Sequence, residues 1–186
     1  MTRPRLTILM LGGARRVSMA ELLKRSGERL GYDIRIVSYE LDSQVPIATV
    51  GKVVTGLRWN DPMVVEDILR VVIEHEASII LPFVDGSISV AAHCKERMPD
   101  LFVPVSDPDT AILMFDKILA AKAFKEAGVP IPTTYKIIDA EMPVIAKPRF
   151  GSASRGIHIF DDIEDLMHLK DISEYLLLDI LLEQIF

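Results

Sequence analysis

Residues 144–157 read Val-Ile-Ala-Lys-Pro-Arg-Phe-Gly-Ser-Ala-Ser-Arg-Gly-Ile and carry the strongest signal in the chain. An apolar run ends at Lys147, a loop of small residues follows, and a second apolar run begins at Ile157. Two strands joined by a glycine-containing loop are typical of an antiparallel hairpin. Small side chains let backbone N–H groups approach phosphate oxygens closely, and a lysine adds a flexible point charge. The stretch therefore predicts a hairpin that binds phosphate.

The loop offers backbone donors, two hydroxyl groups and one further positive charge. Its members are Gly151, Ser152, Ala153, Ser154, Arg155 and Gly156. In a P-loop the lysine follows the glycines and the loop opens a helix, whereas Lys147 precedes this loop. The alternative interpretation is a flexible surface turn beside a solvated lysine. Lys147 together with the upstream segment favours phosphate binding.

The upstream segment predicts a helix from residue 116 to residue 127, with Gly128 as its left-handed stop. Lys117 lies at the start of this helix, where the positive end of the helix dipole would be relieved by a nearby anion. The alternative is an ordinary solvated lysine. Beyond Gly128 the pattern predicts strands at residues 133–138, 143–147, 157–160 and 178–185, with a helix at residues 161–170.

The first half of the chain alternates short apolar runs with helical patterns. Strands are predicted at residues 6–11, 33–39, 52–55 and 78–83, and helices at residues 17–30, 61–76 and 86–98. Strands that are apolar on both faces and separated by helices predict a parallel sheet covered by helices, a Rossmann-like α/β fold. The pattern changes near residue 105, so we predict one domain at residues 1–105 and a second at residues 106–186.

Three groups lie at the carboxyl ends of the predicted parallel strands, where open α/β sheets bind ligands. The loop Gly12-Gly13-Ala14-Arg15-Arg16 could hold an anion at a helix start, or be a tight turn with solvated arginines. Glu40 and Asp42 are interpreted as solvated loop acids rather than ribose ligands, because the pattern G-x-G-x-x-G is missing. Asp85 could cap the following helix or face a substrate.

The composition limits the partners of the protein. A formal net charge of −6 disfavours nucleic acid and anionic membranes. No run approaches the ~20 apolar residues of a membrane span, and the start lacks the features of a signal peptide. A single cysteine, Cys94, fits a reducing cytoplasm.

Taken in order, these segments resemble the ATP-grasp superfamily, in the branch similar to the large subunit of carbamoyl-phosphate synthase. The resembling residues, which span essentially the whole chain, are Ile80-Leu81-Pro82 with Asp85, Asp116-Lys117, Gly128-Val129-Pro130-Ile131-Pro132, Lys147-Pro148, Gly151 to Gly156, and Leu182-Glu183-Gln184-Ile185. The resemblance implies a Rossmann-like pre-ATP-grasp domain followed by the first α+β part of an ATP clamp.

The resemblance also implies roles for individual residues. Lys117 would contact the phosphates of ATP, Lys147 would contact the phosphate and adenine side, and the loop from Gly151 to Gly156 would fold over the phosphates. Glu183 and the backbone of Ile185 would receive adenine. Gly13, Arg15, Arg16 and Asp85 are weaker candidates for contact with substrate.

The family chemistry is activation of a carboxylate as an acylphosphate, followed by attack of an amine. The resemblance therefore implies ATP and Mg²⁺ as cofactors and small carboxylate and amine substrates, and it leaves a homo-oligomer open. The metal ligands of the family lie downstream of the adenine strand, so we expect them beyond residue 186, in a longer parent protein, and we expect the 186 residues alone to be inactive. The alternatives are a non-catalytic nucleotide- or ligand-binding module and, less favoured, a dinucleotide-dependent oxidoreductase.

Overall fold

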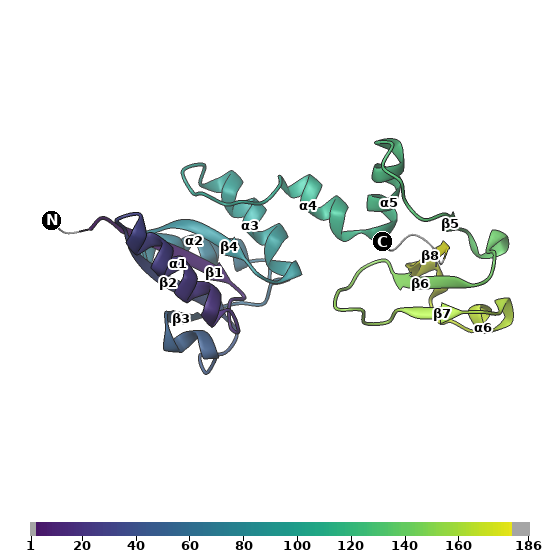
Figure 1. Cartoon of the computed structure of the whole chain (residues 1–186), viewed down its shortest axis with the longest axis horizontal. Helices are drawn as coiled ribbons and strands as arrows, with labels where there is room; N and C mark the ends of the chain where they lie inside the picture. Colours follow the sequence, from purple (N-terminus) through teal and green to yellow (C-terminus); the bar gives the residue numbers. More distant parts are fainter. Residues whose placement is uncertain (1–2, 180–186) are drawn as a thin grey trace. The chain divides into compact units, whose positions relative to one another are not determined.

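The computed structural model describes residues 3–179 and divides the chain into two compact units, residues 1–111 and 112–186. Figure 1 shows the first unit in purple to teal and the second in green to yellow. Among the residues described, no helix combines the length and apolar character that crossing a membrane requires.

The first unit is built on a parallel sheet of four strands. These are β1 (Arg5–Leu11), β2 (Asp33–Glu40), β3 (Lys52–Thr55) and β4 (Ala77–Pro82), in the order β3-β2-β1-β4. Every neighbouring pair runs parallel, which confirms the predicted Rossmann-like sheet. The connections contain α1 (Val17–Arg29), the short 3₁₀ helix η1 (Pro46–Thr49) and α2 (Val64–Glu74), and α3 (Asp85–Arg97) follows β4.

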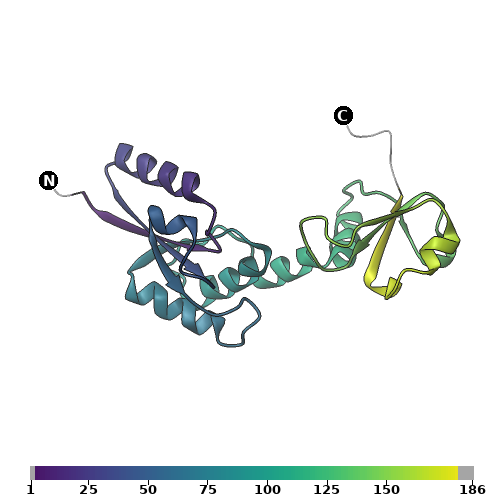
Figure 2. The same ribbon diagram turned by 90° about the horizontal axis from the view of Figure 1, so that it is seen from below.

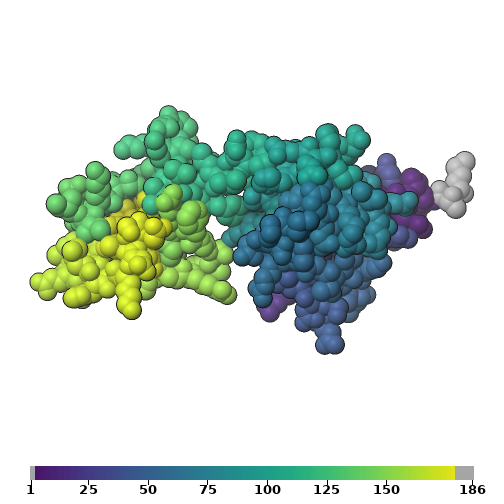
Figure 3. Space-filling model, turned by 180° about the vertical axis from the view of Figure 1, so that it is seen from behind, coloured from purple at the N-terminus to yellow at the C-terminus, as the bar shows by residue number. Residues whose placement is uncertain are grey.

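Side-chain alternation along the strands creates two cores, one on each face of the sheet. Leu9 and Val37 face α2 and α3 and pack there with residues such as Ile68. Ile8 and Ile36 face the opposite way, toward α1 and η1. Figures 1 and 2 show α1 on one side of the sheet and α2 with α3 on the other. In Figure 3 blue and teal residues form most of the visible face of this unit, and purple residues appear at its edges.

The second unit combines helices with a small antiparallel sheet. The helices are α4 (Pro108–Phe115), which begins within the first unit, α5 (Lys117–Glu126) and α6 (Ile163–Met167). The strands are β5 (Thr134–Tyr135), β6 (Val144–Pro148), β7 (His158–Phe160) and β8 (Tyr175–Asp179), in the order β5-β8-β6-β7. Strands β6 and β7 pair antiparallel, so the predicted hairpin is confirmed.

Two predicted strands differ from the structure. The strand predicted at residues 133–138 shrinks to Thr134–Tyr135, because residues 137–139 turn into the 3₁₀ helix η2 (Ile137–Asp139). The strand predicted at residues 178–185 begins earlier, after the 3₁₀ helix η3 (Ile172–Glu174), and residues 180–185 lie outside the described part. The predicted left-handed stop of α5 is confirmed, since Gly128 has φ 73°.

Candidate functional site

The predicted phosphate-binding residues of the second unit surround one cavity of about 240 Å³. Its lining consists of Lys117, Lys147, Pro148, Gly151, Ser152, Ala153, Ser154, Arg155 and Ile157. Of the predicted loop, Gly156 alone is outside this lining and instead lies against Pro148. The hairpin thus brings Lys147 and the small-residue loop to one space, and Lys117 joins them from α5.

Alternation along β6 places Lys147 at this cavity. Val144 and Ala146 are fully buried and pack against Leu166 and Leu177 in the core of the second unit. Lys147 is one residue further along the strand, so its half-buried side chain leaves the opposite face. The strand therefore directs the side chain of Lys147 to the cavity that it lines.

Lys117 reaches the same cavity from the start of α5. Its Nζ donates to the backbone carbonyl of Gly151 at 2.8 Å, and its own N–H donates to the carbonyl of Arg149 at 3.1 Å. The side chain and backbone of Lys117 are therefore both hydrogen-bonded to the segment at residues 149–151.

An ion pair with a buried carboxylate connects the start of α5 to the residue that follows β6. The carboxylate of Asp116 is 3% exposed, caps α5 by accepting from the N–H groups of Ile118 and Leu119, and accepts from Nε of Arg149 at 2.7 Å. The hydrogen bond from Arg149 holds the pKa of Asp116 below its ordinary value. Asp116 and Arg149 thereby position Lys117 relative to the loop that follows Arg149.

The loop backbone is strained at its centre. Ala153 and Ser154 have φ of 55° and 58°, and Gly151 and Gly156 are also at positive φ. A left-handed conformation costs a residue with a Cβ atom about 1–2 kcal/mol. Consecutive strained residues of this kind concentrate at ligand clamps, which fits a loop shaped to present its backbone to a ligand.

The described residues place three basic side chains at the cavity, those of Lys117, Lys147 and Arg155, and contain no ready metal site. Across residues 3–179, no group of three or more histidine, cysteine, aspartate or glutamate side chains is arranged to hold a metal ion. Glu183 and Ile185, the predicted adenine contacts, lie outside the described residues.

The first unit places Gly13 in the predicted loop at the carboxyl edge of its sheet, but an internal acid already occupies the loop donors. Glu40 is 7% exposed and accepts the Ser38 hydroxyl at 2.6 Å as well as the N–H groups of Gly13 and Ala14. Burial raises the pKa of Glu40, and these hydrogen bonds oppose the rise. The prediction that Glu40 is a solvated loop acid is wrong, because the glycine loop folds over its carboxylate.

The other candidates at this edge remain accessible. Arg15 and Arg16 are exposed, and the guanidinium of Arg16 lies 5.9 Å from the centre of the Phe83 ring. Asp85 is exposed in the first turn of α3, whose N-cap is Val84. The hydroxyl of Ser87, rather than Asp85, accepts from the Val84 N–H at 3.4 Å. Asp85 therefore does not serve as the predicted cap.

Sequence reasoning missed Arg149 as a partner of the site. Asp116 was predicted as the first residue of a helix, but its pairing with Arg149 across 33 positions has no local signature. The position of Arg149 between Lys147 and the glycine loop was the one signal that could have indicated its role.

Residues 114–181 match a family model described as an ATP-grasp domain. A search of curated proteins finds no match. N5-carboxyaminoimidazole synthetase from Staphylococcus aureus, solved with ADP, is similar over 95% of this chain and 48% of its own, with a TM-score of 0.67 and 17% identity.

Two further solved structures share the fold. The biotin carboxylase domain dimer of 2-oxoglutarate carboxylase from Hydrogenobacter thermophilus, solved with MgADP, has a TM-score of 0.66 and 22% identity over 92% of this chain and 43% of its own. An L-amino acid ligase from Bacillus licheniformis has a TM-score of 0.65 and 14% identity over 96% of this chain and 44% of its own. The chain spans less than half the length of these three structures.

Fold and site together define a Rossmann-like α/β unit followed by a small α+β unit with a cationic, glycine-lined cavity. The family match at residues 114–181 confirms the resemblance to the ATP-grasp superfamily, and the chain shares its fold with a little under half of each of the three solved structures.

Proposed function

We propose that this chain is the front portion of an ATP-dependent carboxylate–amine ligase, similar to carbamoyl-phosphate synthase, that acts through an acylphosphate. The observation that carries the proposal is the cavity shared by Lys117, Lys147 and the loop at residues 151–155. In this proposal residues 1–105 form the pre-ATP-grasp domain and residues 106–186 the first part of the ATP-grasp domain.

The phosphates of ATP would lie in this cavity. Two ammonium groups, the Arg155 guanidinium and the loop N–H groups would neutralise charge on a transferring phosphoryl group, the main requirement of this chemistry. The fixed link from Lys117 to Gly151 keeps one cation in place before ATP arrives. Mg²⁺ would supply further charge neutralisation, and we assign it no ligand among the residues described.

The remaining assignments follow the same proposal. Glu183 and the backbone of Ile185 would bind adenine. Arg15, Arg16 and Asp85, which are exposed, would contact a carboxylate or amine substrate at the carboxyl edge of the parallel sheet, whereas Gly13, buried and bonded to Glu40, would only shape the loop. We further propose a cytoplasmic location, in keeping with the single free and buried Cys94.

Lys147→Ala in the full-length parent enzyme tests the proposal, with Lys170→Ala as the matched control. Lys170 is an exposed lysine of the second unit that does not line the cavity. ATP-dependent phosphate release should fall by about 10²-fold or more in the first variant, as for loss of a group that stabilises transition-state charge, and stay unchanged in the second. Equal turnover in both variants would refute the role of Lys147.

A second measurement separates the ligase from a binding module. The full-length parent should release phosphate from ATP in the presence of a carboxylate and an amine, whereas ATP binding without release would favour a non-catalytic module. We expect no release from the 186 residues alone, and turnover by them would contradict our assignment of activity to the longer protein.

A further inference from the structure

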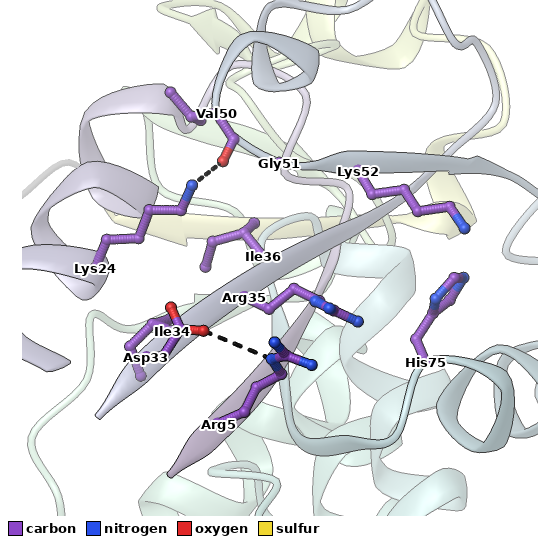
Figure 4. Close-up of a pocket in the computed structure, with 10 residues that line it drawn as sticks. All are labelled: Arg5, Lys24, Asp33, Ile34, Arg35, Ile36, Val50, Gly51, Lys52 and His75. Carbon is purple, nitrogen blue, oxygen red and sulfur yellow. Dashed lines mark hydrogen bonds and ion pairs between the residues drawn. The ribbon is translucent and has the colours of Figure 1, made fainter. Parts of the chain in front are cut away.

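The amino ends of the parallel strands form a second pocket, at the sheet edge opposite the Gly12–Arg16 loop. Its volume is about 350 Å³, within the range of small-ligand sites. The lining residues are Arg5, Lys24, Asp33, Ile34, Arg35, Ile36, Val50, Gly51, Lys52 and His75 (Figure 4). The proposed ligase function assigns no role to this pocket.

Three of the four strands bring a basic residue to this edge, and His75 comes from the end of α2, just before the fourth strand. Arg5 is the first residue of β1, Arg35 is the third residue of β2, and Lys52 is the first residue of β3. His75 lies two residues before β4. The strand register pairs Arg35 with Thr7 and Lys52 with Val37, so Arg5, Arg35 and Lys52 stand on the same face of the sheet. The strand register therefore places these three basic residues next to one another.

The pocket is strongly cationic in a chain of net charge −6. Its lining holds four permanent cations, Arg5, Lys24, Arg35 and Lys52, and one acid, Asp33, which leaves a local balance of +3. Arg5 pairs with Asp33 at 3.5 Å, and Lys24 donates to the carbonyl of Val50. Arg35 and Lys52 have no acid partner within the pocket lining, so their charges remain available to an anion.

His75 adds a buried polar atom that points to a ligand. The residue is only 7% exposed, and among residues 3–179 its Nε2 is the buried side-chain nitrogen or oxygen that lacks a hydrogen-bond partner. Figure 4 shows its ring beside the nitrogen-bearing ends of Arg35 and Lys52. A buried polar atom without a hydrogen bond is costly in a folded protein, so a ligand that bonds to it would stabilise the fold.

Charged groups from three neighbouring elements surround His75. They are Lys52 from β3, Arg35 from β2, and Arg70 and Glu74 from α2; Oε1 of Glu74 lies 3.6 Å from Nε2, while Oε2 of Glu74 is paired with Arg70. Burial lowers the pKa of His75, and the positive charge of Lys52 lowers it further. An anion bound between Lys52 and Arg35 would offset that charge and raise this pKa.

We propose that this pocket is a binding site for a small phosphorylated anion, held by Arg35 and Lys52 with a hydrogen bond to the ring of His75. A phosphate monoester fits the charge balance, and the volume accommodates a phosphate with an attached group of the size of a sugar. The net charge of −6 disfavours a nucleic acid as the occupant.

The test follows the ring signals of the four histidines by NMR while inorganic phosphate or ribose 5-phosphate is added to the 186-residue chain at constant ionic strength. The His75 signal should shift saturably, and the signals of His93, His158 and His168 should not. Arg35→Gln and Lys52→Gln should each weaken binding about tenfold, as for loss of a hydrogen bond to a charged group.

Arg25→Gln is the matched control. Arg25 is exposed, lies next to Lys24 in α1 and is outside the pocket lining, so the variant makes the same charge change without removing a ligand. Its affinity should stay within about twofold of the parent chain, because exposed charges are screened by salt. Substitutions at the exposed residues Arg35 and Lys52 leave the core intact.

The outcomes separate the sources of the anion. Tighter binding of ribose 5-phosphate than of inorganic phosphate supports a phosphate monoester, and equal affinities support phosphate itself. No saturable shift of His75, or equal weakening in Arg25→Gln and Lys52→Gln, would overturn the site. Preferential binding of a single-stranded oligonucleotide would overturn the small-molecule occupant.

Discussion

Replacing Asp116 separates the two tasks of its carboxylate. Asp116→Ala removes both the cap of α5 and the ion pair with Arg149, whereas Asp116→Asn keeps a capping oxygen and loses the charge. Asparagine caps helices as well as aspartate does, and loss of an N-cap costs about 1 kcal/mol. The alanine variant should therefore be less stable than the asparagine variant by about 1 kcal/mol, or about fivefold in the unfolding equilibrium of the second unit.

Native-state hydrogen exchange of amides in β6 and β8 measures this difference, because both strands belong to the second unit. The fluorescence of Trp59, which packs on Tyr39 in the first unit, serves as the control. Equal protection of these amides from exchange in the two variants would show that the cap contributes no stability. Protection in Asp116→Asn equal to that of the wild type would show that the charge of Asp116 contributes none.

The pH dependence of the same variants provides a check on the ion pair. The pKa of Asp116 is lowered in the folded chain, so its charge contributes stability above the ordinary value of 3.8, and this contribution is lost as the pH falls through the lowered pKa. The deficit of Asp116→Asn relative to the wild type should therefore shrink as the solution is acidified below that value. A deficit that does not change with pH would contradict the link to ionisation.

Two further predictions concern the first unit. The pKa of Glu40 is raised in the folded chain, so ionisation of Glu40 opposes folding, and Glu40→Gln should gain stability relative to the wild type as the pH rises from 4.5, the ordinary pKa of the group, toward neutrality. Urea unfolding followed by the fluorescence of Trp59 across this pH range measures the gain. A stability difference that stays constant with pH would contradict the prediction. Gly27→Ala should destabilise the chain, although alanine normally gains about 1 kcal/mol over glycine inside a helix, because the new Cβ would lie 2.0 Å from Cγ1 of Ile34. Thermal unfolding checks this, with Ser26→Ala on the exposed side of α1 as the control, and a higher Tm for Gly27→Ala than for the control would contradict the close contact.

The cavity of the second unit was predictable because its main parts are adjacent in sequence. Lys147 and residues 151–155 belong to one hairpin, and a strand followed by small residues signals that arrangement locally. Lys117 was predicted from its position at a helix start, but its bond to Gly151 spans 34 positions. Contacts of that separation depend on how α5 packs on the sheet, for which no local pattern exists.

By itself, the amino-acid sequence determined the alternation of strands and helices, the parallel sheet, the hairpin and the cationic glycine loop. Those features follow from side-chain periodicity and turn residues, which act over a few neighbouring positions. Only the tertiary structure decided that Glu40 fills the first glycine loop, that Arg149 holds Asp116, and that Arg35, Lys52 and His75 share a pocket. These outcomes depend on strand order and register, which bring distant charges together and determine whether each is solvated, paired or left for a ligand.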